Sequence, residues 1–123
     1  MGQYFKAVNL DKREYVCPSC IGGLAKLWEW AANNHGSIFT LLLQKSDATA
    51  RVDFKSSEVE TAGRWAGDRV VLISDYDSTG LYDEAEKFTN ISEFVVRDWN
   101  EFIGEPNRRL SYDSDCCSSS KLH

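Results

Sequence analysis

The chain has 123 residues, with 19 acidic and 14 basic side chains and a net charge of −5. At roughly 100–200 residues per domain this length holds one domain, and with 42% hydrophobic residues the domain needs neither a metal nor a disulfide merely to fold. The negative charge argues against a nucleic-acid partner because it repels phosphate backbones. No run approaches about 18 consecutive apolar residues and the N-terminus lacks the apolar core of a signal peptide, so we expect a cytoplasmic protein with no membrane partner.

The pattern predicts β-strands in two regions. Residues 4–10 and 14–16 flank a polar turn at 11–13, which is typical of a hairpin. Residues 69–74 form a β-branched run without alternation, the pattern of a strand covered on both faces, so we expect this strand at the centre of the sheet. Residues 38–43 suit either a buried strand or a short helix; periodicity cannot choose, and we favour the helix.

Two longer helices are also predicted. Apolar residues recur at helical spacing over 21–33, which places Trp28 in the core and leaves Trp30 off the apolar stripe. A second apolar face runs over 91–103, and Gly104 is well placed to end that helix because glycine accepts a left-handed conformation.

Together these elements predict an α+β fold. We expect a small, mainly antiparallel sheet, built from the N-terminal hairpin and the strand 69–74 and packed by two or three helices. Residues 1–107 should form a single compact domain. Residues 108–123 are rich in Ser, Asp and Cys with little to bury, so we expect a flexible polar tail there.

Two sequence blocks resemble a known family. The first is the opening MGQYFKAVNLDKREY, and the second is GRWAGDRVV at 63–71 followed by Asp75-Tyr76. They resemble a family of small proteins with no known activity, found in bacteria, phages and some eukaryotes. The resemblance spans about the first seventy-five residues with an unmatched middle, and it implies no ligand or catalytic residue. Family members carry Gly-Asp-Tyr-Ala after the strand where this chain has Ser74-Asp75-Tyr76-Asp77, so the resemblance implies no function for Asp77.

A basic and aromatic block between two glycines is the first candidate site. It places two guanidiniums and a carboxylate beside an indole. Such a cluster could clamp an anionic or planar ligand through bidentate hydrogen bonds and stacking. Equally, the aspartate could pair with either arginine while the tryptophan packs under the hairpin. The candidate ligand-binding residues are Arg64, Trp65, Asp68 and Arg69.

The segment 75–86 matches the spacing of an EF-hand calcium loop. Ca²⁺ takes about six to eight oxygen ligands, which alternate side chains can supply while Gly80 permits the sharp turn. An EF-hand also has a helix before its loop, where this chain predicts a strand, so a polar turn leading into a helix is the alternative. The candidate calcium ligands are Asp75, Asp77, Thr79, Asp83 and Glu86.

Cys17 and Cys20 form a Cys-Pro-Ser-Cys motif between a strand and a helix. A helix N-terminus there would stabilise a thiolate, as in a dithiol redox pair, but the cis-proline loop of thioredoxin-like enzymes has no counterpart. The spacing also suits zinc, with Cys116, Cys117 or His35 to complete a tetrahedron. The adjacent Cys116 and Cys117 would point apart in any regular backbone, so four reduced thiols without a metal are a further interpretation.

No complete catalytic set is visible in the sequence, and we assign no catalytic residue. The function favoured is therefore a non-catalytic binding or interaction module for an unidentified protein or small molecule. One alternative is a divalent-metal-binding protein, with calcium in the 75–86 loop or zinc at Cys17 and Cys20. A second alternative is a dithiol redox protein that uses the same two cysteines. We expect no cofactor beyond these candidate ions.

Overall fold

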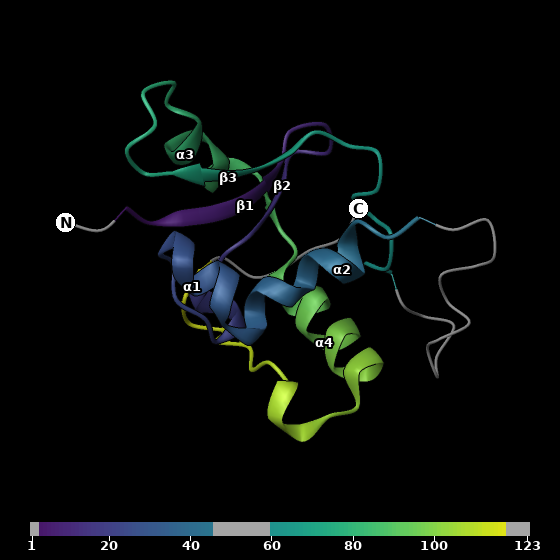
Figure 1. The fold of residues 1–123 in the computed structure, drawn as a ribbon. Helices are drawn as coiled ribbons and strands as arrows, with labels where there is room; N and C mark the ends of the chain where they lie inside the picture. The colour runs from purple at the N-terminus through teal and green to yellow at the C-terminus, as the bar shows by residue number, and fades with distance from the viewer. Residues whose placement is uncertain (1–2, 46–59, 118–123) are drawn as a thin grey trace.

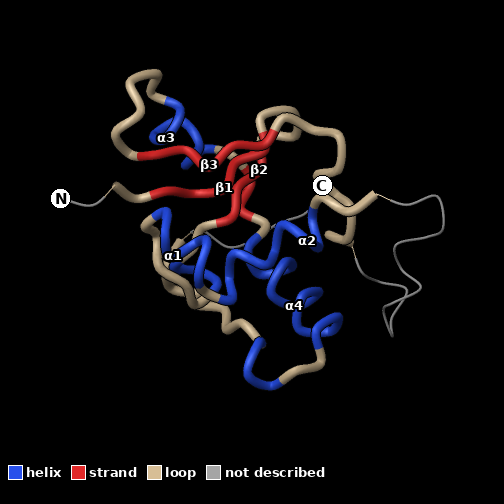
Figure 2. The backbone as a smooth tube through the Cα atoms, viewed as in Figure 1, coloured by secondary structure: helices blue, strands red, loops and turns tan. Residues whose placement is uncertain are grey.

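The computed structural model of the protein describes residues 3–45 and 60–117. These residues form a four-stranded sheet in the order β3-β1-β2-β4, with helices packed against it (Figures 1 and 2). The α+β fold predicted from the sequence is confirmed. The strands are β1 (Phe5–Asn9), β2 (Glu14–Val16), β3 (Val70–Ser74) and β4 (Thr89–Asn90).

The N-terminal hairpin forms where the sequence predicts it. β1 and β2 are antiparallel, with Ala7 opposite Val16 and Asn9 opposite Glu14. β3 pairs antiparallel with the other edge of β1, where Leu72 lies opposite Ala7. β4 adds a short parallel pairing to β2. The sheet is therefore mainly antiparallel, as expected.

β3 lies at an edge of the described sheet, so the prediction that it is central was wrong. β1 takes the inner place because its two edges pair with β2 and β3. β3 nevertheless packs apolar side chains on both faces: Val70 and Leu72 contact the larger core, and Val71 and Ile73 belong to the smaller one. The absence of alternation in the sequence thus reflected two covered faces rather than a central position.

Helices cover both faces of the sheet. α1, α2 and α4 lie on one side of the strands, whereas α3 lies on the other (Figure 1). None of the helices within the described ranges has the length and apolar character needed to cross a membrane. The helices are α1 (Leu27–Ala32), α2 (Ile38–Leu42), α3 (Leu81–Glu84) and α4 (Ser92–Ile103), with 3₁₀ turns η1 (Ser19–Ile21), η2 (Asn34–Ser37), η4 (Ala85–Lys87) and η5 (Pro106–Arg108).

The predicted helix over 21–33 is divided in two. Gly22 has φ 78° and follows η1, and α1 begins only at Leu27. Because of this break, helical spacing counted from residue 21 does not predict which face of α1 each tryptophan occupies. Trp30 is 4% exposed and packs in the core, whereas Trp28 is 64% exposed, the reverse of the prediction.

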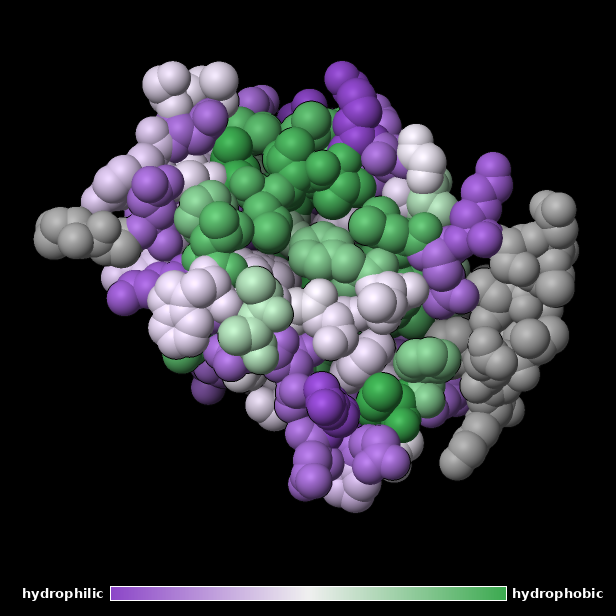
Figure 3. All heavy atoms as spheres, in the orientation of Figure 1, coloured by the Kyte–Doolittle hydropathy of each residue, from purple (hydrophilic) through white to green (hydrophobic). Residues whose placement is uncertain are grey.

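The other predicted helices form. Residues 38–42 make α2, so the ambiguous segment is a helix rather than a strand. α4 ends at Gly104, whose φ of 62° is the left-handed conformation expected there. On the face seen in Figure 3, hydrophobic side chains gather where Figure 1 shows the strands. Partly exposed Val70 and Leu72 of the edge strand β3 fit this picture.

Residues 108–117 of the predicted tail pack against the body of the domain. The Leu110 N–H donates to Asn100 Oδ1 at 2.7 Å, and Asn100 Nδ2 donates to the Leu110 carbonyl at 2.8 Å. The Asp113 N–H donates to the Cys20 carbonyl at 2.8 Å. Composition gives no signal of these contacts because most of them use backbone groups. Residues 118–123 of the predicted tail lie outside the described residues.

Candidate functional site

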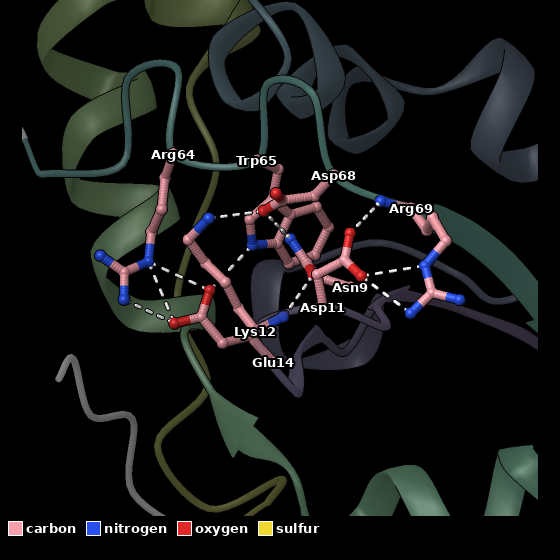
Figure 4. A network of polar contacts seen from close by, with 8 residues as sticks. All are labelled: Asn9, Asp11, Lys12, Glu14, Arg64, Trp65, Asp68 and Arg69. Atoms are coloured by element: carbon pink, nitrogen blue, oxygen red, sulfur yellow. Dashed lines mark hydrogen bonds and ion pairs between the residues drawn. The ribbon is translucent and has the colours of Figure 1, made fainter.

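The predicted ligand-binding block lies against the turn between β1 and β2 (Figure 4). Arg64 Nε lies 3.0 Å from both carboxylate oxygens of Glu14, and Arg64 Nη2 donates to Glu14 Oε2 at 2.5 Å. The indole N–H of Trp65 donates to Glu14 Oε1 at 2.9 Å. The Glu14 side chain is only 3% exposed. The block thus holds a buried carboxylate with the charged and neutral N–H donors that such a group requires.

The remainder of the block pairs with the same turn. Asp68 accepts hydrogen bonds from Lys12 Nζ at 2.5 Å and Asn9 Nδ2 at 2.8 Å, and these bonds lower the pKa of Asp68. Arg69 donates to Asp11 from its backbone N–H at 2.7 Å and from Nε at 2.9 Å, which lowers the pKa of Asp11. Both arginines of the block therefore bind acidic residues of the β1–β2 hairpin, Glu14 in β2 and Asp11 in the turn, rather than the aspartate within the block.

Most polar groups of the block are bonded to other residues of the same chain. Trp65 is fully buried, and Arg64 is bound to a buried carboxylate, so neither side chain is presented for stacking on a ligand. The Arg69 side chain is 74% exposed and stays accessible. The visible role of the block is to fasten residues 64–69 to the hairpin.

The segment 75–86 makes the contacts of a polar turn. Asp75 Oδ1 accepts the backbone N–H of Tyr4 at 2.9 Å. Asp77 accepts hydrogen bonds from the hydroxyl and backbone N–H of Thr79, which lower the pKa of Asp77. Within the described residues, the one group of three or more His, Cys, Asp or Glu close enough to share an ion is made of cysteines. The segment thus leads from β3 into α3 without gathering its carboxylates.

Four cysteines from both ends of the chain converge at one place. Cys17 follows β2, Cys20 lies in η1, and Cys116 and Cys117 lie in a turn near the C-terminus. All four Sγ atoms lie within 4.8 Å of one another. The Cys17–Cys116 and Cys116–Cys117 sulfur pairs are each 3.8 Å apart. Since a disulfide bond is about 2.05 Å long, these are free thiols.

The loop that carries the first cysteine pair is a tight turn. The Gly23 N–H donates to the Pro18 carbonyl at 2.8 Å. Gly22 adopts φ +78°, and a Cβ at this position would lie 2.6 Å from Ser111 Oγ. Glycine is therefore favoured at position 22 for two reasons: the left-handed backbone, and the close approach of Ser111.

The second pair joins the cluster because it lies in a turn. The Cys116 N–H approaches the Asp113 carbonyl at 3.4 Å, and the Asp115 N–H donates to Asp113 Oδ1 at 2.9 Å. The expectation that the neighbouring thiols of Cys116 and Cys117 point apart was wrong here, because it applies to a regular helix or strand. In this turn both thiols face the Cys17–Cys20 loop.

His35, the other residue considered as a zinc ligand, stands apart from the cluster. Its Nε2 lies 2.9 Å from the Leu24 carbonyl oxygen, and its ring packs 4.7 Å from that of Trp30. Burial lowers the pKa of His35, an effect partly opposed by the Leu24 hydrogen bond and by Glu29. The histidine is thus a buried packing residue.

The environment of the cluster favours neutral thiols. Cys20 is fully buried, and burial raises its pKa, with the neighbouring Cys17 adding to the shift. Burial likewise raises the pKa of Tyr15, which lies beside the cluster. A Zn²⁺ ion supplies the positive charge that thiolates need in such a place.

The sequence offers Cys116 and Cys117 only as possible partners of the first cysteine pair, and it does not single out Lys6. The cysteine count was the available signal, but Cys17 and Cys116 are separated by 99 positions, which no local pattern connects. Lys6 had no signal, because a lysine in a loosely alternating strand is expected to face solvent. In the structure Lys6 is a buried residue of β1.

Comparisons of the chain with protein-family models, with curated proteins and with solved structures find no match.

Proposed function

We propose that the protein is a zinc-binding module in which Cys17, Cys20, Cys116 and Cys117 hold one structural Zn²⁺. A Zn–S bond of about 2.3 Å and tetrahedral geometry place four sulfur atoms about 3.8 Å from one another. The observed separations are 3.8 Å for two sulfur pairs and at most 4.8 Å for the others. This agreement is the observation that carries the proposal.

The ligand set indicates a structural role for the ion. Four cysteine ligands fill the tetrahedron and leave no position for water or substrate, whereas catalytic zinc sites keep one position open. Because the unfolded chain holds no assembled site, zinc binding adds to the stability of the folded state. The ion would join the loop after β2 to the C-terminal segment. This arrangement supports a non-catalytic binding or interaction module.

The metal content of the purified full chain tests the proposal. We expect one zinc per chain by elemental analysis, and we expect Co²⁺ to replace it with the sulfur-to-cobalt charge-transfer absorption of a thiolate site. Calorimetric titration with Ca²⁺ tests the 75–86 loop in the same preparation. A chain that carries no zinc and gives no cobalt–thiolate spectrum would overturn the proposal, whatever the calcium result.

Substitutions then locate the ligands. Cys20→Ser and Cys117→Ser should each lower zinc affinity by about ten-fold or more, since each removes a first-coordination ligand. His35→Gln is the matched control and should keep the full zinc content, because the ring contacts Leu24 and Trp30 instead. Wild-type zinc affinity in Cys117→Ser would contradict the four-cysteine site.

A further inference from the structure

A cavity of about 720 Å³ lies beside the cysteine cluster, between the start of β1, residues 17–19, residues 24–29 and α3 with η4. Its size falls in the range of roughly 300–1,000 Å³ that small-molecule sites occupy. Cys17 and Cys117 form part of its wall. The apolar and aromatic residues of the wall include Tyr4, Phe5, Tyr15, Pro18, Leu24 and Tyr82.

Lys6 is the unusual group in this wall. It shares the α3 side of β1 with Val8 and is only 8% exposed. Its Nζ lies 4.1 Å from the centre of the Tyr82 ring and 5.6 Å from that of Tyr15. Within the described residues, this ammonium has no ion pair and no hydrogen bond. The two rings stabilise the cation, and Nζ keeps contact with solvent because no fully buried side-chain nitrogen or oxygen of the described residues lacks a hydrogen-bond partner.

The acidic residues of the wall form no ion pair with Lys6. Glu29 Oε1 accepts the backbone N–H of Lys26 at 3.0 Å, at the start of α1. Glu86 is exposed on η4 and forms no ion pair with Lys6. The pocket therefore combines an apolar wall, two flanking phenol rings and the ammonium of a largely buried lysine that forms no ion pair.

We propose that this pocket binds a small organic anion, a carboxylate on an apolar body of ring size. The carboxylate would pair with Lys6 Nζ, and the body would lie against the tyrosine rings. An ion pair in such a wall is worth more than one on the surface, because water screens it less. The residues that carry this inference are not zinc ligands, so it does not rest on the metal.

The first test compares an acid with its neutral analogue on the full chain as purified. Calorimetric titration with 2-naphthoate and with 2-naphthamide varies the charge while the ring body stays the same. We expect the acid to bind about ten-fold or more tightly, the usual effect of a hydrogen bond to a charged group. Equal affinities, or no binding of either compound, would overturn the proposal. This comparison needs no variant that folds.

Two lysine substitutions then test whether the Lys6 ammonium binds the carboxylate. Lys6→Met keeps the apolar stem and should abolish the preference for the acid. Lys87→Met is the matched control, because Lys87 is exposed and does not line the pocket, and it should change the naphthoate affinity by less than about two-fold. A carboxylate that bound a metal ion at the cysteines instead would keep its advantage in Lys6→Met. That result would therefore contradict the assignment.

Discussion

Two polar clusters join distant parts of this chain, and they differ in what they leave unsatisfied. Around Glu14, a carboxylate meets the guanidinium of Arg64 and the indole N–H of Trp65, so opposite charges and matched donors close the network. At the cysteine cluster, four like groups face one another, and the nearby Lys6 ammonium forms no ion pair among the described residues.

A cluster with many kinds of binding side chain is not necessarily free to bind a ligand. The Arg64–Arg69 block is the richest cluster of binding residue types in the sequence, and the fold uses most of it internally. The thiols and Lys6 are simpler groups, but a metal ion and an anion would complete them. Both proposals therefore rest on groups for which the chain supplies no ionic partner among the described residues.

Of the predicted changes in stability, removal of the metal from the cysteine cluster should be the largest. If the zinc proposal holds, chelation should lower the free energy of unfolding by on the order of 5 kcal/mol, less than in zinc-finger peptides because a hydrophobic core remains. Denaturant unfolding before and after chelation measures this change. Zinc, but not calcium, should restore the original curve. Identical curves with and without chelator would contradict a structural ion.

Breaking the Glu14–Arg64 ion pair should give the next largest loss of stability. Arg64→Ala leaves the Glu14 carboxylate buried without its ionic partner and should cost about 3 kcal/mol of stability. Arg69→Ala is the matched control: its side chain is 74% exposed, so the same melt should change little. Both variants should keep their zinc.

A reversed result would change how the block is interpreted. If Arg64→Ala melted like the wild type, the Glu14 ion pair would not hold the fold, and Arg64 would return as a ligand-binding candidate. Denaturant melts of the two variants, recorded beside the wild type, distinguish these outcomes.

The smallest expected effect is a pH dependence of stability that comes from His35, which lies in neither cluster. Burial lowers the pKa of His35, so near its ordinary value of about 6.5 the unfolded chain binds more protons than the folded one. The stability contributed by neutral His35 is thus complete above about pH 6.5 and is lost as the pH falls below it.

His35→Gln removes this titration and should flatten the acid side of the stability curve. Melts of both proteins between about pH 7.5 and pH 5.5 test the slope. The zinc content should be measured at each pH, because acid also releases metal from thiolates. An unchanged slope with unchanged zinc would show that another group titrates.

The sequence alone determined the elements that depend on neighbours along the chain. The hairpin of β1 and β2, the helix α4 and its end at Gly104 follow from alternation, helical spacing and a glycine stop. Where a local break intervened, the same rules failed: Gly22 interrupts the predicted helix, so Trp30 rather than Trp28 enters the core.

Only the tertiary structure decided which side chains meet. Arg64 finds Glu14 across 50 positions, and Cys17 meets Cys116 across 99. Lys6 lies beneath Tyr82 because a short helix folds back over the sheet. Spacing along the chain fixes local geometry, because neighbouring residues share one backbone path. Contacts between distant residues depend on how whole elements pack, and no local pattern carries that information.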